Sequence, residues 1–286
     1  MLHVRDPLAA RRIVTRKSHY LRFLDKKSLR AIDREKPRPE NERREDERIR
    51  GEILRPFNVP DFLKSDTSTD LNGYFGSKGT YDAAGKLESY STWFRCLVKM
   101  MLKADELTAS GKNYKWHEMG IFTRWDRVGS CKVLCVDTPR EMASGLEEAL
   151  AGSTPDLKDP FAMHAPLIDQ IVKLYDDSVW AIRHPIREIE KTRQAAVPHF
   201  LEMHEISRHG THISEIISVT IETMENLLRQ QKAIYEKLDV LEKSYREQAQ
   251  EYTRFQLQMI KSLGHRSCSN NERLKSETTL VMKSLP

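Results

Sequence analysis

The stretch THISEIISVTIETMENLLRQQKAIYEKLDVLEKSYREQAQEYTRFQLQMIKSL, residues 211–263, dominates the sequence and runs for fifty-three residues without a glycine or a proline. Its apolar side chains recur about every 3.5 residues, which is the repeat of a helix that packs lengthwise against another helix. A single helix over this stretch would be roughly 80 Å long. We therefore predict one long stalk helix over residues 200–263. The seam has fourteen positions, eleven of them apolar: Ile213, Ile217, Thr220, Met224, Leu227, Gln231, Ile234, Leu238, Leu241, Tyr245, Gln248, Tyr252, Phe255 and Met259.

A second helix is predicted immediately before the stalk helix, over about residues 166–192. Arg193–Pro198 interrupts the pattern, so the two helices are expected to be antiparallel and coiled-coil-like. A further helical segment is expected at residues 267–285, and the whole region 161–286 is predicted to be a stalk. The apolar seam of the second helix comprises Leu167, Ile171, Leu174, Ile182, Ile186 and Ile189.

Residues 51–160 are predicted to form a mixed α/β domain. Within it, residues 91–107 are predicted to be a helix, because their apolar residues are spaced four and three apart. A later helix is predicted from the sequence TPRE, residues 138–141, which has Thr at the N-cap and Glu at the third position of a capping box. This helix is expected to reach about Leu150. The complete chain is thus predicted to be α+β and mainly α.

Two runs with strand character, residues 116–126 and 131–137, are separated by RVGS at 127–130. A glycine in so short a connection predicts a β-hairpin. Cys131 and Cys135 would lie on one face of the second strand but about 13 Å apart, which excludes a shared metal ion. We predict that both are core residues.

Residues 1–50 carry sixteen Lys and Arg against nine Asp and Glu. This basic surplus accounts for the net charge of +5, because the rest of the chain is slightly acidic. Leu21 and Leu24 suggest a short helix, and residues 40–50 are predicted to be a solvated helix or a disordered tail. The segment is interpreted as a charged leader. A nucleic-acid-binding role remains a separate hypothesis, although no aromatic interleaving accompanies the charge.

Four cysteines in 286 residues are too few for a disulfide framework, so reduced thiols are expected. The first twenty residues lack the apolar core of a signal peptide, and no apolar run is long enough to span a bilayer. The chain as given is therefore expected to be soluble and cytoplasmic.

One group of residues is a candidate metal site. Glu205, His209 and His212 are spaced four and three residues apart, so on a helix they share one face. His204 and His209 are five residues apart, one too many for the zinc motif His-Glu-x-x-His. The alternative interpretation is that these residues form hydrogen bonds or pair with Arg208 where the helix meets the α/β domain.

No catalytic constellation is visible. The paired carboxylates Asp176 and Asp177 are neighbours on a predicted helix and point apart, which does not suit acid–base catalysis. The motifs Gly-x-Ser-x-Gly and Gly-x-Gly-x-x-Gly are absent from the chain. We therefore expect that the protein is not an enzyme and has no small-molecule substrate.

Seven segments follow one another in a recognisable order. They are YKWHEM (114–119), VLCVDTP (133–139), DPFAMHAPLIDQIVKLYDDSVWAIR (159–183), MHEISRHGTHISE (203–215), IETME (221–225), FQLQM (255–259) and NNERL (270–274). Together they resemble the fungal CorA-like proteins, which are divergent relatives of the CorA magnesium transporters. The resemblance covers about residues 90–282 and depends on the order of the segments.

The resemblance implies a cytosolic α/β domain and a stalk helix, which in the family leads into two transmembrane helices. It also implies a pentamer that senses divalent cations, so Mg²⁺ is expected as a regulatory ion and no other cofactor is expected. The family's Gly-Met-Asn motif is absent from these 286 residues, so this chain as written is expected to be truncated and unable to conduct ions. No ion-binding residue is transferred. Asp159, Asp169, Asp176 and Glu215 match family positions, but capping and ion pairing explain them equally well.

Two functions remain open at this point. The first is the cytosolic, homo-oligomeric portion of a CorA-like divalent metal transporter, whose full-length relatives are membrane-associated. The alternative is a soluble coiled-coil adaptor that acts through helix–helix contacts.

Overall fold

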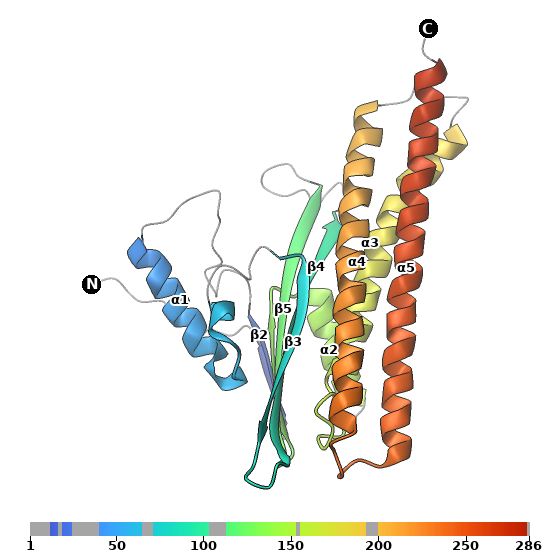
Figure 1. The fold of residues 1–286 in the computed structure, drawn as a ribbon. Helices are drawn as coiled ribbons and strands as arrows, with labels where there is room; N and C mark the ends of the chain where they lie inside the picture. The colour runs from blue at the N-terminus through green and yellow to red at the C-terminus, as the bar shows by residue number, and fades with distance from the viewer. Residues whose placement is uncertain are drawn as a thin grey trace.

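The computed structural model describes residues 12–16, 19–24, 40–64, 71–102, 113–152, 155–192 and 200–284. In these residues a β-sheet lies between one short helix, α1, and a group of long helices on its other face (Figure 1). The fold is α+β and mainly α, as predicted.

The sheet is mixed and has the strand order β1-β2-β6-β5-β4-β3. β2 and β6 are parallel, and the other neighbouring strands are antiparallel. The strands are β1 (Arg12–Arg16), β2 (His19–Leu24), β3 (Gly73–Tyr81), β4 (Leu87–Met101), β5 (Tyr114–Asp126) and β6 (Ser130–Val136).

Five α-helices and two short 3-10 helices are described. α3, α4 and α5 are by far the longest, and α4 and α5 run side by side over most of their length (Figure 1). The helices are α1 (Glu40–Leu54), η2 (Arg55–Phe57), η3 (Asp61–Lys64), α2 (Arg140–Gly152), α3 (His164–Thr192), α4 (Phe200–Tyr235) and α5 (Lys243–Ser284).

The hairpin prediction is confirmed. β5 and β6 pair in an antiparallel register, and Gly129 in the turn has φ +84, a conformation that glycine adopts without strain. Cys131 and Cys135 are buried, as predicted. The helix predicted after Pro139 is α2, with Glu141 in its first turn.

The predicted helix at residues 91–107 is wrong over its described part, which is the strand β4. β4 is a central strand, and Trp93 and Phe94 are both buried, in hydrophobic clusters on opposite faces of the sheet. A strand buried on both faces lacks the alternation of apolar and polar residues that marks a half-buried strand. Its apolar residues therefore also fit a helical spacing.

Part of the N-terminal charged leader, residues 1–50, belongs to the fold. Leu21 and Leu24, which suggested a helix, lie on the strand β2, and Leu21 is 0% exposed. The strand forms because β2 pairs in parallel with β6 and places Leu21 in the core between sheet and helices. A solvated helix and a disordered tail were both open for residues 40–50. The structure has the helix α1 there, and its Ile49 and Ile53 are buried against the sheet.

The single stalk helix over residues 200–263 is also wrong. α4 ends at Tyr235, and α5 begins at Lys243 and extends beyond residue 263 to Ser284. The connection reverses the chain, so the stretch forms a helical hairpin (Figure 1). Leu238 and Leu241 in the connection are buried beside Tyr90 and Trp125 of the sheet. Burying these two leucines against the sheet favours a turn over a continuous, solvated helix.

The turn also changes which residues of α5 face inward. The seam residues before it are buried on α4, whereas Tyr252, Phe255 and Met259 after it are exposed. The inner face of α5 repeats with steps of three and four residues, but five of its nine positions are polar. These positions are Thr253, Gln256, Ile260, Leu263, Ser267, Asn270, Leu274, Glu277 and Val281.

The division into residues 1–50, 51–160 and 161–286 stays a prediction. The largest hydrophobic cluster draws on all three parts, from Leu21 on β2 to Val281 on α5. It lies between the sheet and helices α2 to α5.

Candidate functional site

Two of the three predicted metal candidates, Glu205 and His209, lie close together near the start of α4. His209 is 1% exposed, and its ring packs edge-on against Tyr114 with 5.0 Å between the ring centroids. Glu205 forms an ion pair with Arg208, and its Oε2 lies 3.8 Å from Nε2 of His209. Pairing with Arg208 was the alternative interpretation of the sequence, and the structure contains that pair.

The third candidate, His212, points toward a buried lysine. Its Nδ1 lies 2.9 Å from Nζ of Lys99, which also lies 4.3 Å from the ring centroid of Tyr114 and 5.0 Å from that of Trp116. Burial lowers the pKa of Lys99 to about 8, and the charge of Arg208 acts in the same direction.

These contacts do not favour a metal ion at Glu205, His209 and His212. An ammonium group beside His212 repels a second cation, and it takes up Nδ1, one of the two imidazole nitrogens that could bind a metal. Within the described ranges, no group of three or more His, Cys, Asp and Glu side chains is placed to hold a metal ion.

A second polar cluster lies at the far end of α4. Asp159 is 3% exposed and accepts hydrogen bonds from the hydroxyls of Tyr235 (2.8 Å) and Tyr245 (3.0 Å) and from the amide of Phe161 (2.8 Å). Burial raises the pKa of Asp159 to about 6. The carboxylate joins the segment before α3 to both sides of the α4–α5 turn, which is a structural role.

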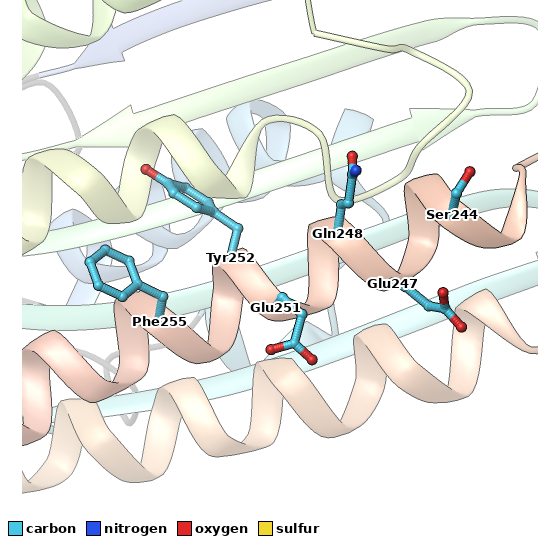
Figure 2. A pocket seen from close by; sticks show the side chains of 6 residues that line it. All are labelled: Ser244, Glu247, Gln248, Glu251, Tyr252 and Phe255. Carbon is cyan, nitrogen blue, oxygen red and sulfur yellow. The ribbon is translucent and has the colours of Figure 1, made fainter.

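The outer face of α5 carries the exposed end of the predicted seam. Tyr252, Phe255 and Met259 are 44%, 54% and 39% exposed. The rings of Tyr252 and Phe255 lie next to each other, with 6.3 Å between their centroids (Figure 2). A shallow groove of about 520 Å³ runs beside these rings and is lined by Ser244, Glu247, Gln248, Glu251, Tyr252 and Phe255.

Hydrogen bonds to α3 hold this face of α5 in position. The Tyr252 hydroxyl donates to both carboxylate oxygens of Asp169 on α3, at 2.9 Å each. Gln256 donates to the same carboxylate and to the carbonyl of Ala165, each at 2.8 Å. The outer face of α5 is therefore a candidate interaction surface. The sequence pattern predicted that these apolar residues lie in a buried seam.

The fold is similar to solved cytoplasmic domains of metal transporters. The ZntB cytoplasmic domain from Vibrio parahaemolyticus aligns with a TM-score of 0.53 and 11% identity, over 94% of this chain and 91% of that one. The soluble domain of CorA from Methanocaldococcus jannaschii aligns with a TM-score of 0.50 and 10% identity, over 93% and 87%. The complete CorA magnesium transporter from the same organism aligns with a TM-score of 0.51 and 9% identity, over 94% and 72%. The chain has a CorA-like fold.

Sequence comparisons add less. No known protein-family profile matches the chain. A curated relative, Notoamide biosynthesis cluster protein M' from Aspergillus versicolor, is 26% identical over 137 residues. The match spans 42% of this chain and only 30% of that relative. In the described part of the chain, no helix has the length and apolar character required to cross a membrane.

Proposed function

We propose that this chain acts as the cytoplasmic domain of a CorA-like divalent metal transporter. The observation that carries the proposal is the shared fold, which extends over 94% of this chain and 91% of the ZntB cytoplasmic domain. The proposed role is assembly and regulation, not catalysis. Mg²⁺ is the proposed regulatory ion, and no other cofactor is required.

In this proposal the chain works as a homo-oligomer of five copies, and the outer face of α5 contacts a neighbouring copy. Tyr252, Phe255 and Met259 continue a spacing of about 3.5 residues, which suits packing against another helix. Aromatic residues and methionine are also the types enriched at protein interfaces.

The exposed apolar side chains of α5 also favour a second candidate function, an adaptor that binds a helix of another protein. The two functions differ in their response to metal. A regulated transporter domain changes its assembly with Mg²⁺, whereas an adaptor that uses only apolar helix contacts does not.

Light scattering coupled to size-exclusion chromatography, with Mg²⁺ or with EDTA, tests both candidates. We expect a pentamer whose population depends on Mg²⁺. The double variant Phe255→Ser/Met259→Ser should dissociate it, because it removes two exposed apolar side chains and keeps the hydrogen bonds between Tyr252 and Asp169. Val128→Ser is the matched control, since Val128 is apolar and 91% exposed but lies in the β5–β6 turn.

A dimer that ignores metal would support the adaptor instead. A monomer under all conditions would contradict the transporter-domain candidate, because that candidate requires a homo-oligomer. Dissociation of the Val128→Ser control would show that the α5 face is not the specific contact.

A further inference from the structure

Strands β4 and β5 and helix α4 enclose one lysine side chain, Lys99, which the proposed function does not use. Lys99 is 1% exposed. Its Nζ lies 2.9 Å from Nδ1 of His212 on α4, and 4.3 Å and 5.0 Å from the ring centroids of Tyr114 and Trp116 on β5. An imidazole and two aromatic rings therefore surround the amine.

No carboxylate balances the charge of this lysine. Among the residues that the structure describes, Lys99 forms no ion pair. On α4, Glu205 is paired with Arg208, and Glu215 accepts a hydrogen bond from Asn72. Burial lowers the pKa of Lys99 to about 8, Arg208 acts in the same direction, and Glu205 opposes them. The neutral amine is favoured because a buried ammonium group without a paired carboxylate is costly.

A neutral amine in this position is a nucleophile. Near neutral pH it is present on the order of a hundredfold more often than in a lysine with the ordinary pKa of 10.5. His212 can accept a proton from it, because burial lowers the pKa of His212 below its ordinary value of 6.5 and keeps the ring neutral. Lys99 and His212 thus pair a nucleophile with a base.

The surrounding charges favour an anion at the end of the Lys99 side chain. Burial lowers the pKa of both His209 and His212, and the charges of Lys99 and Arg208 lower them further. His209 is 1% exposed, and neither of its ring nitrogens has a hydrogen-bond partner among the described residues. Turning the cation at Lys99 into an anion would change these repulsions into attractions.

We propose that Lys99 is a modification site that reacts with carbon dioxide to form a carbamate. The lone pair of Nζ attacks the carbon of CO₂, and a C–N bond forms. One C=O π bond breaks, and its electron pair goes to oxygen. The proton that the amine loses passes to Nδ1 of His212 and then to water. Nothing is oxidised or reduced, and the product carries one negative charge.

The burial of Lys99 selects for so small an electrophile. CO₂ is uncharged and has three atoms. The side chains that cover the amine, Tyr114, Trp116 and His212, are themselves partly exposed, and rotamer changes of such side chains admit a molecule of this size. An aldehyde or an acyl donor with a substituent would require the rings to separate.

Carbon-13 NMR of the full chain under labelled CO₂ tests the proposal, because a carbamate carbon resonates apart from dissolved CO₂ and from bicarbonate. We expect a carbamate resonance near neutral pH that disappears when the labelled gas is replaced by nitrogen. It should be absent from Lys99→Arg, because a guanidinium stays charged. Lys86→Arg is the matched control and should keep it, since Lys86 is an exposed lysine in the β3–β4 turn.

A second variant tests the electrostatic argument at an exposed position. Arg208→Gln removes a positive charge near Lys99 and leaves Glu205 unpaired, so the carbamate resonance should weaken several-fold. Arg254→Gln is its matched control, because Arg254 forms the same kind of pair with Glu251 three residues before it, on α5. Circular dichroism checks that each variant is folded.

Three results would overturn the proposal. The first is no carbamate resonance from the folded wild-type chain under CO₂. The second is a carbamate spectrum of Lys99→Arg identical to that of the wild type. The third is an equal loss of the resonance in Arg208→Gln and Arg254→Gln. None of these readings depends on the number of copies in the assembly, so the carbamate and the oligomer are tested separately.

Discussion

The guanidinium of Arg246 donates a hydrogen bond of 2.6 Å to the backbone carbonyl of Tyr235. Tyr235 is the last residue of α4, and Arg246 lies in the first turns of α5. A second hydrogen bond, 3.4 Å long, reaches the carbonyl of Leu238 in the connection. The last carbonyls of a helix have no partner within the helix, so a cation here stabilises the point where α4 ends.

Replacing Arg246 should therefore weaken the helical hairpin. We expect Arg246→Ala to lower the free energy of unfolding by about 1–3 kcal/mol, because hydrogen bonds from a charged donor are lost. Urea denaturation measures the change, and hydrogen exchange of residues 236–242 shows whether the turn opens first. Arg254→Ala is the control, since Arg254 is an exposed residue of α5 whose ion pair among the described residues is with the nearby Glu251. Equal effects in both variants would contradict the role of Arg246.

His209 should make the fold sensitive to acid. Burial lowers its pKa to about 4, from the ordinary value of 6.5, and the charges of Lys99 and Arg208 act in the same direction. The unfolded chain therefore binds a proton at a higher pH than the folded chain does. The contribution of His209 to stability is present above pH 6.5 and is lost as the pH falls toward 4, at up to about 1.4 kcal/mol per pH unit.

The variant His209→Phe removes this titration and keeps a ring against Tyr114. Its free energy of unfolding should fall less than that of the wild type between neutral pH and the lower end of that window. Denaturation curves at several pH values measure the difference. His184→Phe, at an exposed position of α3, is the matched histidine-to-phenylalanine control. If His209→Phe shows the full acid loss, the assignment to His209 is wrong.

Asp159 changes the stability of the fold with pH in the opposite direction to His209. Its pKa is raised to about 6 by burial, so the folded chain takes up a proton at a higher pH than the unfolded chain, whose ordinary value is 3.8. Its contribution is fully present below pH 3.8 and is lost as the pH rises through about 6. Asp159 thus offsets part of the acid loss caused by His209.

Asp159→Asn should abolish this offset. We expect the variant to lose stability more steeply than the wild type as the pH falls from 6 toward 4, because the losses from buried histidines such as His209 and His164 are no longer offset. The same denaturation series measures it. Asp239→Asn, at an exposed position in the α4–α5 turn, serves as the comparison. A parallel pH profile for Asp159→Asn and the wild type would refute the prediction.

Gly73 marks a close approach of β3 to α4. A Cβ atom at this position would lie 2.9 Å from the carbonyl oxygen of Arg95 and 2.9 Å from Cγ1 of Val219. Gly73→Ala should therefore destabilise the protein by about 1–3 kcal/mol, because α4 must move away from the sheet. Gly152→Ala meets no atom within 4 Å and should change stability by less than about 0.5 kcal/mol. Thermal unfolding compares the two, and equal melting temperatures would contradict the close approach.

Local signals in the sequence were sufficient for part of the fold. The β5–β6 hairpin was predictable because glycine stands between two strand-like runs, and α2 was predictable from its capping residues. β4 was not, because a strand buried on both faces has no alternation to read. Leu21 was misassigned for a related reason, since β2 is a strand only by virtue of its parallel pairing with the distant β6.

The candidate interaction surface on α5 was likewise only partly predictable from the sequence. The sequence predicted the apolar repeat that contains Tyr252 and Phe255, but it placed the repeat in a buried seam. No local pattern predicted the cluster around Lys99, because Lys99, Tyr114 and His212 meet only when β4, β5 and α4 pack together.

By itself, the sequence determined that most of residues 211–263 is helical, because the 3.5-residue repeat is a local property. Only the tertiary structure decided where this stretch reverses and which face of α5 lies inside. Leu238 and Leu241 are buried against the sheet, and Arg246 stabilises the end of α4. The polar inner face of α5 tolerates burial because residues such as Gln256 and Asn270 find hydrogen-bond partners on α3. Those partners lie about ninety residues away in the sequence, so no local pattern could reveal them.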